Sequence, residues 1–441
     1  MTAHSQAPLP LLKISANKRY FQTSDGRPFF WLGDTGWLLF TKCSKESAVQ
    51  YLETRQRQGF NVVQVMVLHT LKAKNVYGKT ALINDDITQP DTSTAGNGES
   101  YWQMIDFIVG EAGKRGIYVA MVPVWGSNVK DGKLSVPQAT QYAKFLAARY
   151  KKYNNIIWLN GGDIKGSDHI AIWKAIGTTI KKYDNRHLQT FHPRGRSSSS
   201  EWFHQEAWLD FNMFQSGHKD YAQDTISSEK IHYGEDNWKF VNADYRLTPV
   251  KPTMDGEPSY ENIPHGLHDS LAKRWTAADI RRYAYWSVFA GGAGFTYGEN
   301  AVMQFNKMGD RTANFGVNSN WTTTVEAEGA QQMQYLKKLL LSKSYFDRLP
   351  AQEIIAGNTN NRYVYLLATK GNGYALVYTY TGANCSINMA RLPFAAGKAG
   401  WYNPRNGAIT AIGNVNKKGI VVFDPPGEPA EGNDWVLVLE K

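Results

Sequence analysis

The feature that most constrains the fold of this chain is the alternation of apolar, strand-sized runs with helical segments. Runs that are apolar along their whole length and are separated by helices indicate a parallel sheet, because each strand is then buried on both faces. Eight such runs predict an α/β fold of the (β/α)8 TIM-barrel type. They cover residues 29–32, 61–68, 118–125, 155–163, 188–193, 209–216, 252–258 and 294–298.

Helix signals lie between several of these runs. Ser44 begins a helical stretch that extends to Arg57, and Gly59 ends it. An open doubly wound sheet is the rival architecture, and it normally carries a G-x-G-x-x-G turn after its first strand. The first turn here, residues 33–36, reads GDTG and does not match, so the barrel is favoured. Further helices are expected at residues 101–114, 137–153, 168–183 and 277–289.

The sequence pattern changes after about residue 345. A helix expected at residues 325–341 leads into short alternating runs such as RYVYLLAT, YALVYTYT and DWVLVLE, which Gly, Asn and Pro separate. Short alternating runs separated by turn residues are typical of antiparallel strands in a β-sandwich. We therefore expect an N-terminal tail over residues 1–14, a barrel over residues 15–345 and a β-sandwich domain over residues 346–441.

Composition narrows the classes of function. The net charge is +10, but the basic residues are scattered in pairs, so no nucleic-acid-binding patch is predicted. No apolar run approaches the roughly 20 residues of a membrane span. The two cysteines, Cys43 and Cys385, lie far apart and exclude a disulfide framework. Residues 2–12 (TAHSQAPLPLL) look like what remains after signal-peptide removal, so we expect export to the periplasm or cell surface.

The candidate functional residues lie at the carboxyl ends of the predicted strands, where barrels of this type carry their catalytic and binding groups. They form a polar and aromatic ring around one mouth of the barrel. Its members are Asp34, Trp37, His69, Trp125, Asp163, His192, Gln215, Glu257, Tyr297 and Glu299. Four more aromatic residues are candidates either for packing on a sugar ring or for the core, namely Trp31, Trp158, Tyr260 and Trp286.

Two carboxylates stand apart because glycine precedes each of them, in Gly161-Gly162-Asp163 and in Gly256-Glu257. Glycine lets the backbone approach a ligand closely. The fourth and seventh strands lie on facing parts of an eight-stranded ring, so their tips can share one pocket. Hydrolysis of a glycosidic bond needs such a pair: one acid protonates the leaving oxygen, and one carboxylate attacks the anomeric carbon or activates water. The sequence therefore predicts a glycoside hydrolase.

Other chemistries find little support in the sequence. It contains no H-E-x-x-H, C-x-x-C or G-x-S-x-G motif, so we expect no metal, no cofactor and no acyl transfer. A group of basic residues follows the fourth to sixth strands and is a candidate for contacts with galacturonate carboxylates. Its members are Lys165, Arg194, Arg196, His218 and Lys219.

Four segments resemble one family. FFWLGDTGW (29–37), WLNGGD (158–163), KPTMDGEPSYE (251–261) and RRYAYWSVFAGGAGFTYG (281–298) are similar to glycoside hydrolase family 140, the apiosidases that act on the pectin rhamnogalacturonan II. The part of the chain that follows the predicted barrel resembles a β domain once labelled as collagen-binding. The resemblance implies that Asp163 is the general acid/base and Glu257 the nucleophile of a retaining reaction. The implied partner is a plant cell-wall polysaccharide or oligosaccharide.

One feature departs from the wider group of retaining barrels, which usually carry Asn-Glu at the fourth strand. This chain has Gly162-Asp163 there, and Asp is one methylene shorter than Glu, so its reach requires the backbone to move inward. A furanose such as apiose suits that altered shape. Two alternatives stay open: another furanosidase or glycosidase of the group, such as an arabinofuranosidase, and a non-catalytic carbohydrate- or collagen-binding protein.

Overall fold

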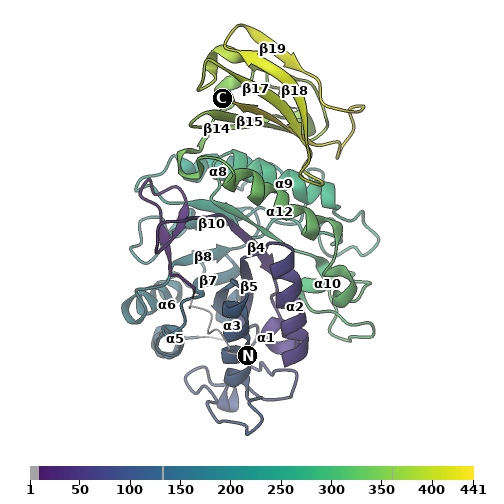
Figure 1. Ribbon diagram of the computed structural model, residues 1–441. Helices are drawn as coiled ribbons and strands as arrows, with labels where there is room; N and C mark the ends of the chain where they lie inside the picture. The colour runs from purple at the N-terminus through teal and green to yellow at the C-terminus, as the bar shows by residue number, and fades with distance from the viewer. Residues whose placement is uncertain (1–8, 132–133, 360) are drawn as a thin grey trace, which may run out of the picture.

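The computed structural model describes residues 9–131, 134–359 and 361–441. They form a barrel with a smaller β domain packed on one side of it (Figure 1). The expectation of export depends largely on residues 1–8, which lie outside the described residues. Within the described ranges, no helix is both long enough and apolar enough to cross a membrane.

Eight parallel strands form the wall of the barrel, and each overlaps one of the predicted runs. Their order around the wall is β8-β7-β6-β5-β4-β12-β11-β10, and the short β9 (Ser197–Ser198) pairs antiparallel with β10. The ring closes where β8 meets the segment before β10, and the amide of Asp210 donates there to the carbonyl of Gln189. The (β/α)8 prediction is confirmed as a nearly closed barrel. The strands are β4 (Trp31–Thr35), β5 (Val62–Leu68), β6 (Tyr118–Val124), β7 (Ile156–Ile164), β8 (Gln189–Pro193), β10 (Asn212–Gln215), β11 (Thr253–Asp255) and β12 (Gly294–Tyr297).

Helices cover the outside of the barrel, and side-chain caps explain where several of them begin. The Ser44, Ser135 and Thr276 hydroxyls each accept a hydrogen bond from a backbone amide in the first turn of the helix that follows. The long helices are α2 (Lys45–Arg57), α3 (Tyr101–Lys114), α5 (Val136–Tyr150), α6 (Ile170–Tyr183), α8 (Asn237–Tyr245), α9 (Ala277–Phe289) and α12 (Glu328–Leu341). The short ones are α1 (Leu39–Lys42), α4 (Gly126–Asp131), α7 (Ser200–Phe203), α10 (Asn300–Met303) and α11 (Trp321–Thr324).

A small antiparallel sheet covers the amino ends of the barrel strands. It consists of β1 (Leu12–Ile14), β2 (Phe21–Thr23) and β3 (Pro28–Phe29). Phe21 packs edge-on against Phe211, which directly precedes β10, with ring centroids 5.0 Å apart. This sheet closes the end of the barrel opposite the predicted site.

The C-terminal part is an antiparallel sandwich of a six-stranded and a two-stranded sheet, as predicted. The order of the larger sheet is β13-β14-β15-β20-β17-β18. Val377 and Leu437 of this sheet share a core with Ile387 and Phe423 of the smaller one. The strands are β13 (Leu349–Pro350), β14 (Leu367–Gly371), β15 (Tyr374–Thr379), β16 (Cys385–Asn388), β17 (Ala396–Tyr402), β18 (Ile409–Asn416), β19 (Ile420–Phe423) and β20 (Trp435–Glu440). Single 3-10 turns are η1 (Ile83–Asp85), η2 (Tyr345–Asp347), η3 (Gln352–Ile354), η4 (Arg362–Val364) and η5 (Met389–Arg391).

The β domain packs on the side of the barrel that carries α8, α9 and α12 (Figure 1). Arg281 of α9 forms an ion pair with Asp434, with Nη2 2.8 Å from Oδ1, and both side chains are buried. Tyr285 of α9 stacks on Tyr378 with a centroid separation of 4.7 Å. Buried charge and stacked rings therefore fix the β domain to the barrel.

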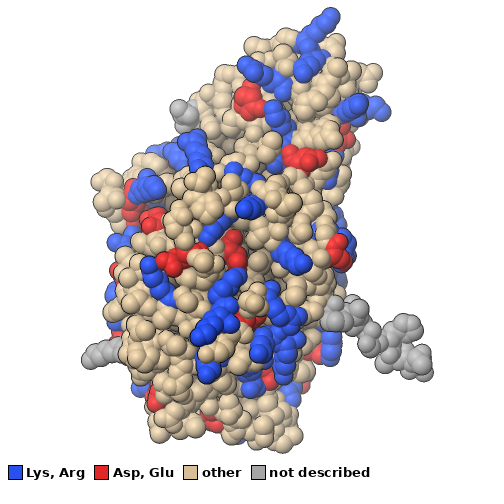
Figure 2. Space-filling model, turned by 90° about the vertical axis from the view of Figure 1, so that its left-hand side faces the viewer, with Lys and Arg blue, Asp and Glu red and all other residues tan. Residues whose placement is uncertain are grey.

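Positive charge is widely distributed over the side of the molecule that includes α5 and α6 (Figure 2). Some of these bases are paired: Lys174 lies 2.8 Å from Glu206, and Lys181 lies 2.7 Å from Asp210. Acidic residues are interspersed among the basic ones across this face (Figure 2). On this face, acidic residues therefore offset part of the positive charge.

Candidate active site

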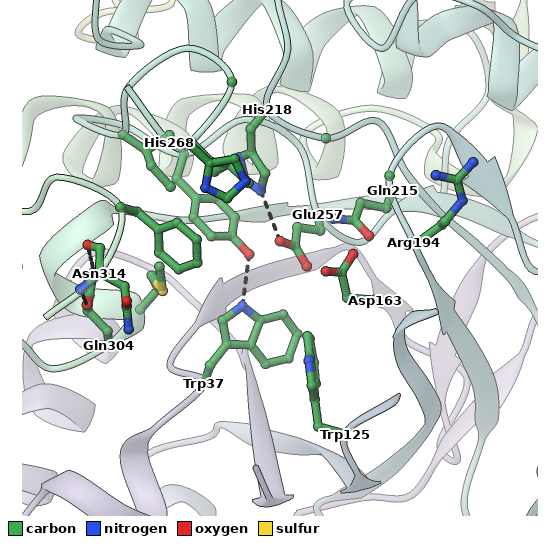
Figure 3. A pocket seen from close by; sticks show the side chains of 18 of the residues that line it. Trp37, Trp125, Asp163, Arg194, Gln215, His218, Glu257, His268, Gln304 and Asn314 are labelled. Atoms are coloured by element: carbon green, nitrogen blue, oxygen red, sulfur yellow. Dashed lines mark hydrogen bonds and ion pairs between the residues drawn. The ribbon is translucent and has the colours of Figure 1, made fainter. Parts of the chain in front are cut away.

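A cavity of about 620 Å³ opens at the carboxyl ends of the barrel strands. This size lies within the range of small-molecule sites, roughly 300–1,000 Å³, and this end of the barrel is where enzymes of the fold carry their sites. Several of the predicted residues line it together (Figure 3). They are Trp37, His69, Trp125, Asp163, Gln215 and Glu257.

Asp163 reaches the cavity because the end of β7 leaves regular strand geometry. The pairing of β7 with β8 shifts register between Gly161 and Ile164. Gly161, Gly162 and Asp163 have φ values of 91°, 108° and 50°. Such values strain a residue with a side chain, and strain of this kind concentrates at functional sites. A Cβ at Gly162 would also lie 2.6 Å from the Trp125 ring. This backbone distortion delivers the short Asp side chain into the cavity.

The carboxyl group of Asp163 is exposed to the cavity, and protein atoms surround the cavity in turn. It faces Glu257 and lies beside Gln215 (Figure 3). The surrounding protein displaces bulk water, and the charge of Glu257 lies close by. Both effects, desolvation first, raise the pKa of Asp163. This environment favours the protonated acid.

Glu257 follows β11 and is held by two imidazoles. Nε2 of His218 lies 3.0 Å from its Oε1, and Nε2 of His192 lies 3.1 Å from its Oε2. Burial alone would raise the pKa of Glu257, but His192 and His218 outweigh it and lower the pKa to about 2. The amide of Gly217 also donates to the carbonyl of Glu257. Glu257 is therefore an ionised carboxylate fixed at the wall of the cavity.

Aromatic rings form the side of the cavity below these carboxylates. The indole N–H of Trp37 donates to the hydroxyl of Tyr260 over 2.9 Å. Trp37 and Trp125 meet edge to face with centroids 5.3 Å apart, and His192 contacts Trp37 at the same separation. His69 lies on the wall, where burial lowers its pKa. Rings with a fixed orientation suit contact with the apolar face of a sugar.

The structure places Asp34 away from the cavity, which corrects the expectation that it contacts substrate. Its side chain points to the helix layer, where the Tyr51 hydroxyl donates to Oδ2 over 2.5 Å and the Arg55 Nε donates over 2.7 Å. Both partners belong to α2. Asp34 and Arg55 are fully buried. The pair anchors α2 to β4, the first barrel strand.

Replacing Asp34 with Ala should destabilise the protein by about 3–5 kcal/mol, because the buried Arg55 guanidinium would lose its counter-charge. Urea unfolding measures this effect, and Tyr51→Phe is the matched control, with an expected cost of only about 1 kcal/mol. Activity per folded molecule should stay at the wild-type level. A large fall in kcat/KM with unchanged stability would return Asp34 to the substrate site.

Tyr297 and Glu299 are likewise buried outside the cavity wall, which corrects the same expectation for them. The Tyr297 hydroxyl donates to Oε2 of Glu261 over 2.6 Å. Glu299 caps α10 by accepting hydrogen bonds from the amides of Ala301 and Val302, and burial raises its pKa to about 7. These residues hold the end of β12 and the helix that follows it. Trp31, Trp158 and Trp286 are fully buried in the core.

The basic group predicted to meet substrate carboxylates is largely paired within the protein. Arg194 and Arg196 both line the cavity, and both form ion pairs with Glu229. Arg196 also lies 3.0 Å from Asp224. Lys219 lines the cavity beside them. This wall therefore carries little of the chain's net charge.

Sequence reasoning missed the closest partner of Glu257. It included His218 only as a candidate for contacts with substrate carboxylates and not as a partner of Glu257, although the residue follows the end of β10 directly, as Ser216-Gly217-His218. The opposite wall of the cavity, formed by the segments around His268 and around Gln304 and Asn314, was also missed (Figure 3). Irregular segments form that wall, and they carry no periodic signal. Within the described residues, no cluster of three or more His, Cys, Asp or Glu side chains suits a metal ion.

Comparison with known proteins identifies the group to which this barrel belongs. A family model described as the apiosidase-like catalytic domain matches residues 15–347. The chain belongs to the apiosidase-like family. A second model, described as "Putative collagen-binding domain of a collagenase", matches residues 349–440 of this apiosidase-like chain.

Solved structures support the same assignment. One, described as a glycoside hydrolase, is 43% identical with a TM-score of 0.94, and the match covers 98% of this chain and 97% of the other. Another is a glycoside hydrolase family 5 protein from Bacteroides vulgatus ATCC 8482, 42% identical with a TM-score of 0.94, with coverage of 98% and 94%. A search of curated proteins found no match. The apiosidase-like chain is thus a glycoside hydrolase by family and by full-length structural similarity.

Proposed function

We propose that the chain is a retaining glycoside hydrolase that releases apiosyl residues from side chains of rhamnogalacturonan II in plant cell-wall pectin. One observation carries the proposal: Asp163, with a raised pKa, and Glu257, with a lowered pKa, face each other in a single cavity. Opposed pKa shifts in a carboxyl pair assign one acid and one base or nucleophile. Membership of the apiosidase-like family supports the choice of sugar. Such a polymer places the enzyme in the periplasm or at the cell surface.

The reaction proceeds in two displacements. Glu257 attacks the anomeric carbon while the glycosidic C–O bond breaks, and the proton of Asp163 passes to the departing oxygen. Asp163, now a carboxylate, takes a proton from water, the water oxygen attacks the anomeric carbon, and Glu257 leaves. Two inversions at one carbon give net retention.

The neighbours of the pair have distinct roles in this scheme. His192 and His218 keep Glu257 ionised, and the hydrogen bond with His218 holds Oε1 in place. Trp37 and Trp125 offer ring faces and edges to the apolar side of the sugar. The inward backbone at Gly161 and Gly162 sets the distance from Asp163 to a small furanose ring.

A panel of defined plant cell-wall oligosaccharides tests the substrate, with apiosyl, arabinofuranosyl and pyranosyl termini compared at equal concentration. We expect free apiose as the main product, with the anomeric configuration retained when the first product is read by proton NMR. Release of arabinose in its place would reassign the sugar within the same mechanism. An inverted first product would remove Glu257 from the role of nucleophile.

The pH dependence of kcat/KM should be bell-shaped and should report both carboxyls. Activity is lost as the pH falls toward about 2, because Glu257 becomes protonated. It is lost again as the pH rises through the raised pKa of Asp163, because the acid loses its proton. The profile is measured from about pH 2 to about pH 9, so that it includes the acidic limb. In Asp163→Asn the alkaline limb should disappear from the residual activity, and an unchanged limb would contradict the assignment.

A further inference from the structure

We propose that the β domain positions a residue of the active site. Arg362 and Tyr363 of η4 hold the connection between β10 and α8, residues 216–236, in the position from which His218 contacts Glu257. The catalytic consequence rests on the proposed function, whereas the positioning itself does not. His218 is a site residue, and Arg362 and Tyr363 are positioning residues.

The connection begins at the active site. His218 is its third residue, and its ring contacts Glu257 and also meets Tyr260 edge to face at 4.6 Å. Its carbonyl accepts hydrogen bonds from the amide of Gly266 and the indole of Trp275. The backbone of His218 is thus held on one side by the segment that follows β11.

The side chain of Glu235, near the end of the connection, bonds to a residue near its start. The amide of Tyr221, three residues after His218, donates to Oε1 of Glu235 over 2.8 Å. The Tyr221 hydroxyl donates to Asp236 over 2.7 Å. Glu235 is buried, and its Oε2 lies 2.6 Å from Nη2 of Arg282 in α9. The orientation of Glu235 therefore governs where the first residues of the connection lie.

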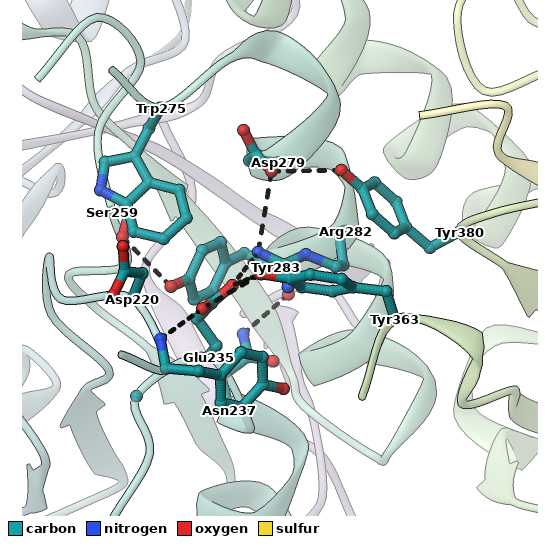
Figure 4. A network of polar contacts seen from close by, with 12 residues as sticks. Asp220, Glu235, Asn237, Ser259, Trp275, Asp279, Arg282, Tyr283, Tyr363 and Tyr380 are labelled. Carbon is teal, nitrogen blue, oxygen red and sulfur yellow. Dashed lines mark hydrogen bonds and ion pairs between the residues drawn. The ribbon is translucent and has the colours of Figure 1, made fainter. Parts of the chain in front are cut away.

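The β domain contacts Glu235 directly (Figure 4). The Tyr363 hydroxyl donates to Oε2 of Glu235 over 3.0 Å. The Arg362 guanidinium lies 4.2 Å from the centre of the Tyr221 ring, and the Tyr363 ring lies 5.6 Å from it. A cation over a ring face and a hydrogen bond to a buried carboxylate are both directional contacts. Together they fix Tyr221 and Glu235, and through them the path of the chain to His218.

Two other contacts of the same domain are made to α9 and not to the connection. The Tyr380 hydroxyl donates to Asp279 at the start of α9 over 3.1 Å, and Arg281 pairs with Asp434. These contacts attach the β domain to the barrel. The contribution of Arg362 and Tyr363 is therefore separable from attachment, and Tyr380→Phe is a control that removes one hydroxyl from the same interface.

Displacement of His218 has a specific electrostatic consequence. Glu257 is faced by His192 from β8, His218 from the connection, Asp163 from β7 and Tyr260 from the segment after β11. Loss of the His218 contact removes one of the two imidazoles that favour the carboxylate. The pKa of Glu257 then rises, and the acidic limb of the pH profile moves to higher pH.

The test uses the full-length protein with Arg362→Ala combined with Tyr363→Phe, Tyr363→Phe alone, and the Tyr380→Phe control. We expect the double variant to lose about 10-fold in kcat, with KM changed less than about twofold, because the aromatic wall stays intact. Its acidic limb should move up by about one pH unit, and Tyr380→Phe should match the wild type. Thermal unfolding verifies that every variant is folded, and Tyr363→Phe provides the milder variant.

Two measurements are independent of turnover. Hydrogen–deuterium exchange of peptides from residues 216–236 should be faster in the double variant, less so in Tyr363→Phe and unchanged in Tyr380→Phe. Carbon NMR of the Glu257 carboxyl should show a higher titration midpoint in the double variant. Unchanged exchange and an unchanged midpoint would overturn the positioning proposal. Both changes in a protein that hydrolyses no glycoside would support the positioning while the proposed function fails. If the double variant has the same kcat as Tyr380→Phe and the acidic limb of its pH profile does not shift, Arg362 and Tyr363 only attach the β domain to the barrel.

Discussion

Replacing Glu257 with Gln should lower kcat/KM on an apiosyl oligosaccharide by about 10⁴-fold or more, because an amide of the same shape cannot attack the anomeric carbon. The side chain keeps its size, so the cavity and its aromatic wall should persist. Single-turnover kinetics measure the loss. Substrate binding to the variant, measured by calorimetry, should remain, which separates loss of chemistry from loss of recognition.

The matched control for this variant is Glu261→Gln. Glu261 is a buried carboxylate four residues further along the chain, but it contacts Tyr297 and the amide of Gly329 and does not line the cavity. Its replacement should affect stability and leave activity per folded molecule near the wild-type value. A Glu257→Gln enzyme with a near wild-type rate would remove Glu257 from the mechanism.

The second large effect is expected for Asp163→Ala. Hydrolysis of the natural substrate should slow by about 10²–10⁴-fold, because no group protonates the departing oxygen. A substrate with an activated phenol as leaving group needs little protonation, so its first step should stay fast and the glycosyl-enzyme should accumulate. Azide should then accelerate turnover, since it attacks that intermediate without general-base help.

The product of that reaction provides the decisive readout. A glycosyl azide of retained configuration places Asp163 at the acid/base position and identifies a covalent intermediate. Asp163→Glu serves as the companion variant, because it restores a carboxyl with one additional methylene on the same positive-φ backbone. If azide neither accelerates turnover nor forms an adduct in Asp163→Ala, the acid/base assignment fails.

The strands of the barrel were predictable because a strand buried on both faces has a direct signature in the sequence. The run at residues 61–68 became β5 (Val62–Leu68), and that at 118–125 became β6 (Tyr118–Val124). Helix starts such as Ser44 were predictable from capping chemistry. Both signals are local, so neither depends on the path of the loops.

The expectation that site residues lie at the carboxyl ends of the strands predicted the level of each residue along the barrel axis. It did not predict the direction of its side chain. Asp163 and Glu257 lie at that level and line the cavity, whereas Asp34, at the same level, points outward to α2. Alternation along a strand decides between these directions. A shift of one residue reverses the assignment, as the register shift at the end of β7 illustrates.

The contact of His218 with Glu257 was beyond prediction for a different reason. The place of His218 depends on the path of an irregular connection, in which the amide of Tyr221 donates to Glu235, and on the hydrogen bond that the indole of Trp275, far away in the sequence, donates to its carbonyl. No periodicity encodes such a path. The participation of Tyr363, from the other domain, could be recognised only in three dimensions.

The adjacent arginines of α9 have a consequence for the evolution of this architecture. Arg282 is neutralised by Glu235 of the barrel, whereas its neighbour Arg281 is neutralised by Asp434 of the β domain. A β domain without Asp434, docked on the same face, would bury Arg281 without its counter-charge, and unmatched buried cations are costly. Gene fusion or module exchange at this junction would therefore be penalised unless both halves changed in concert. The barrel and the β domain should therefore be inherited together, in keeping with the two solved structures that align with this chain over nearly their full length.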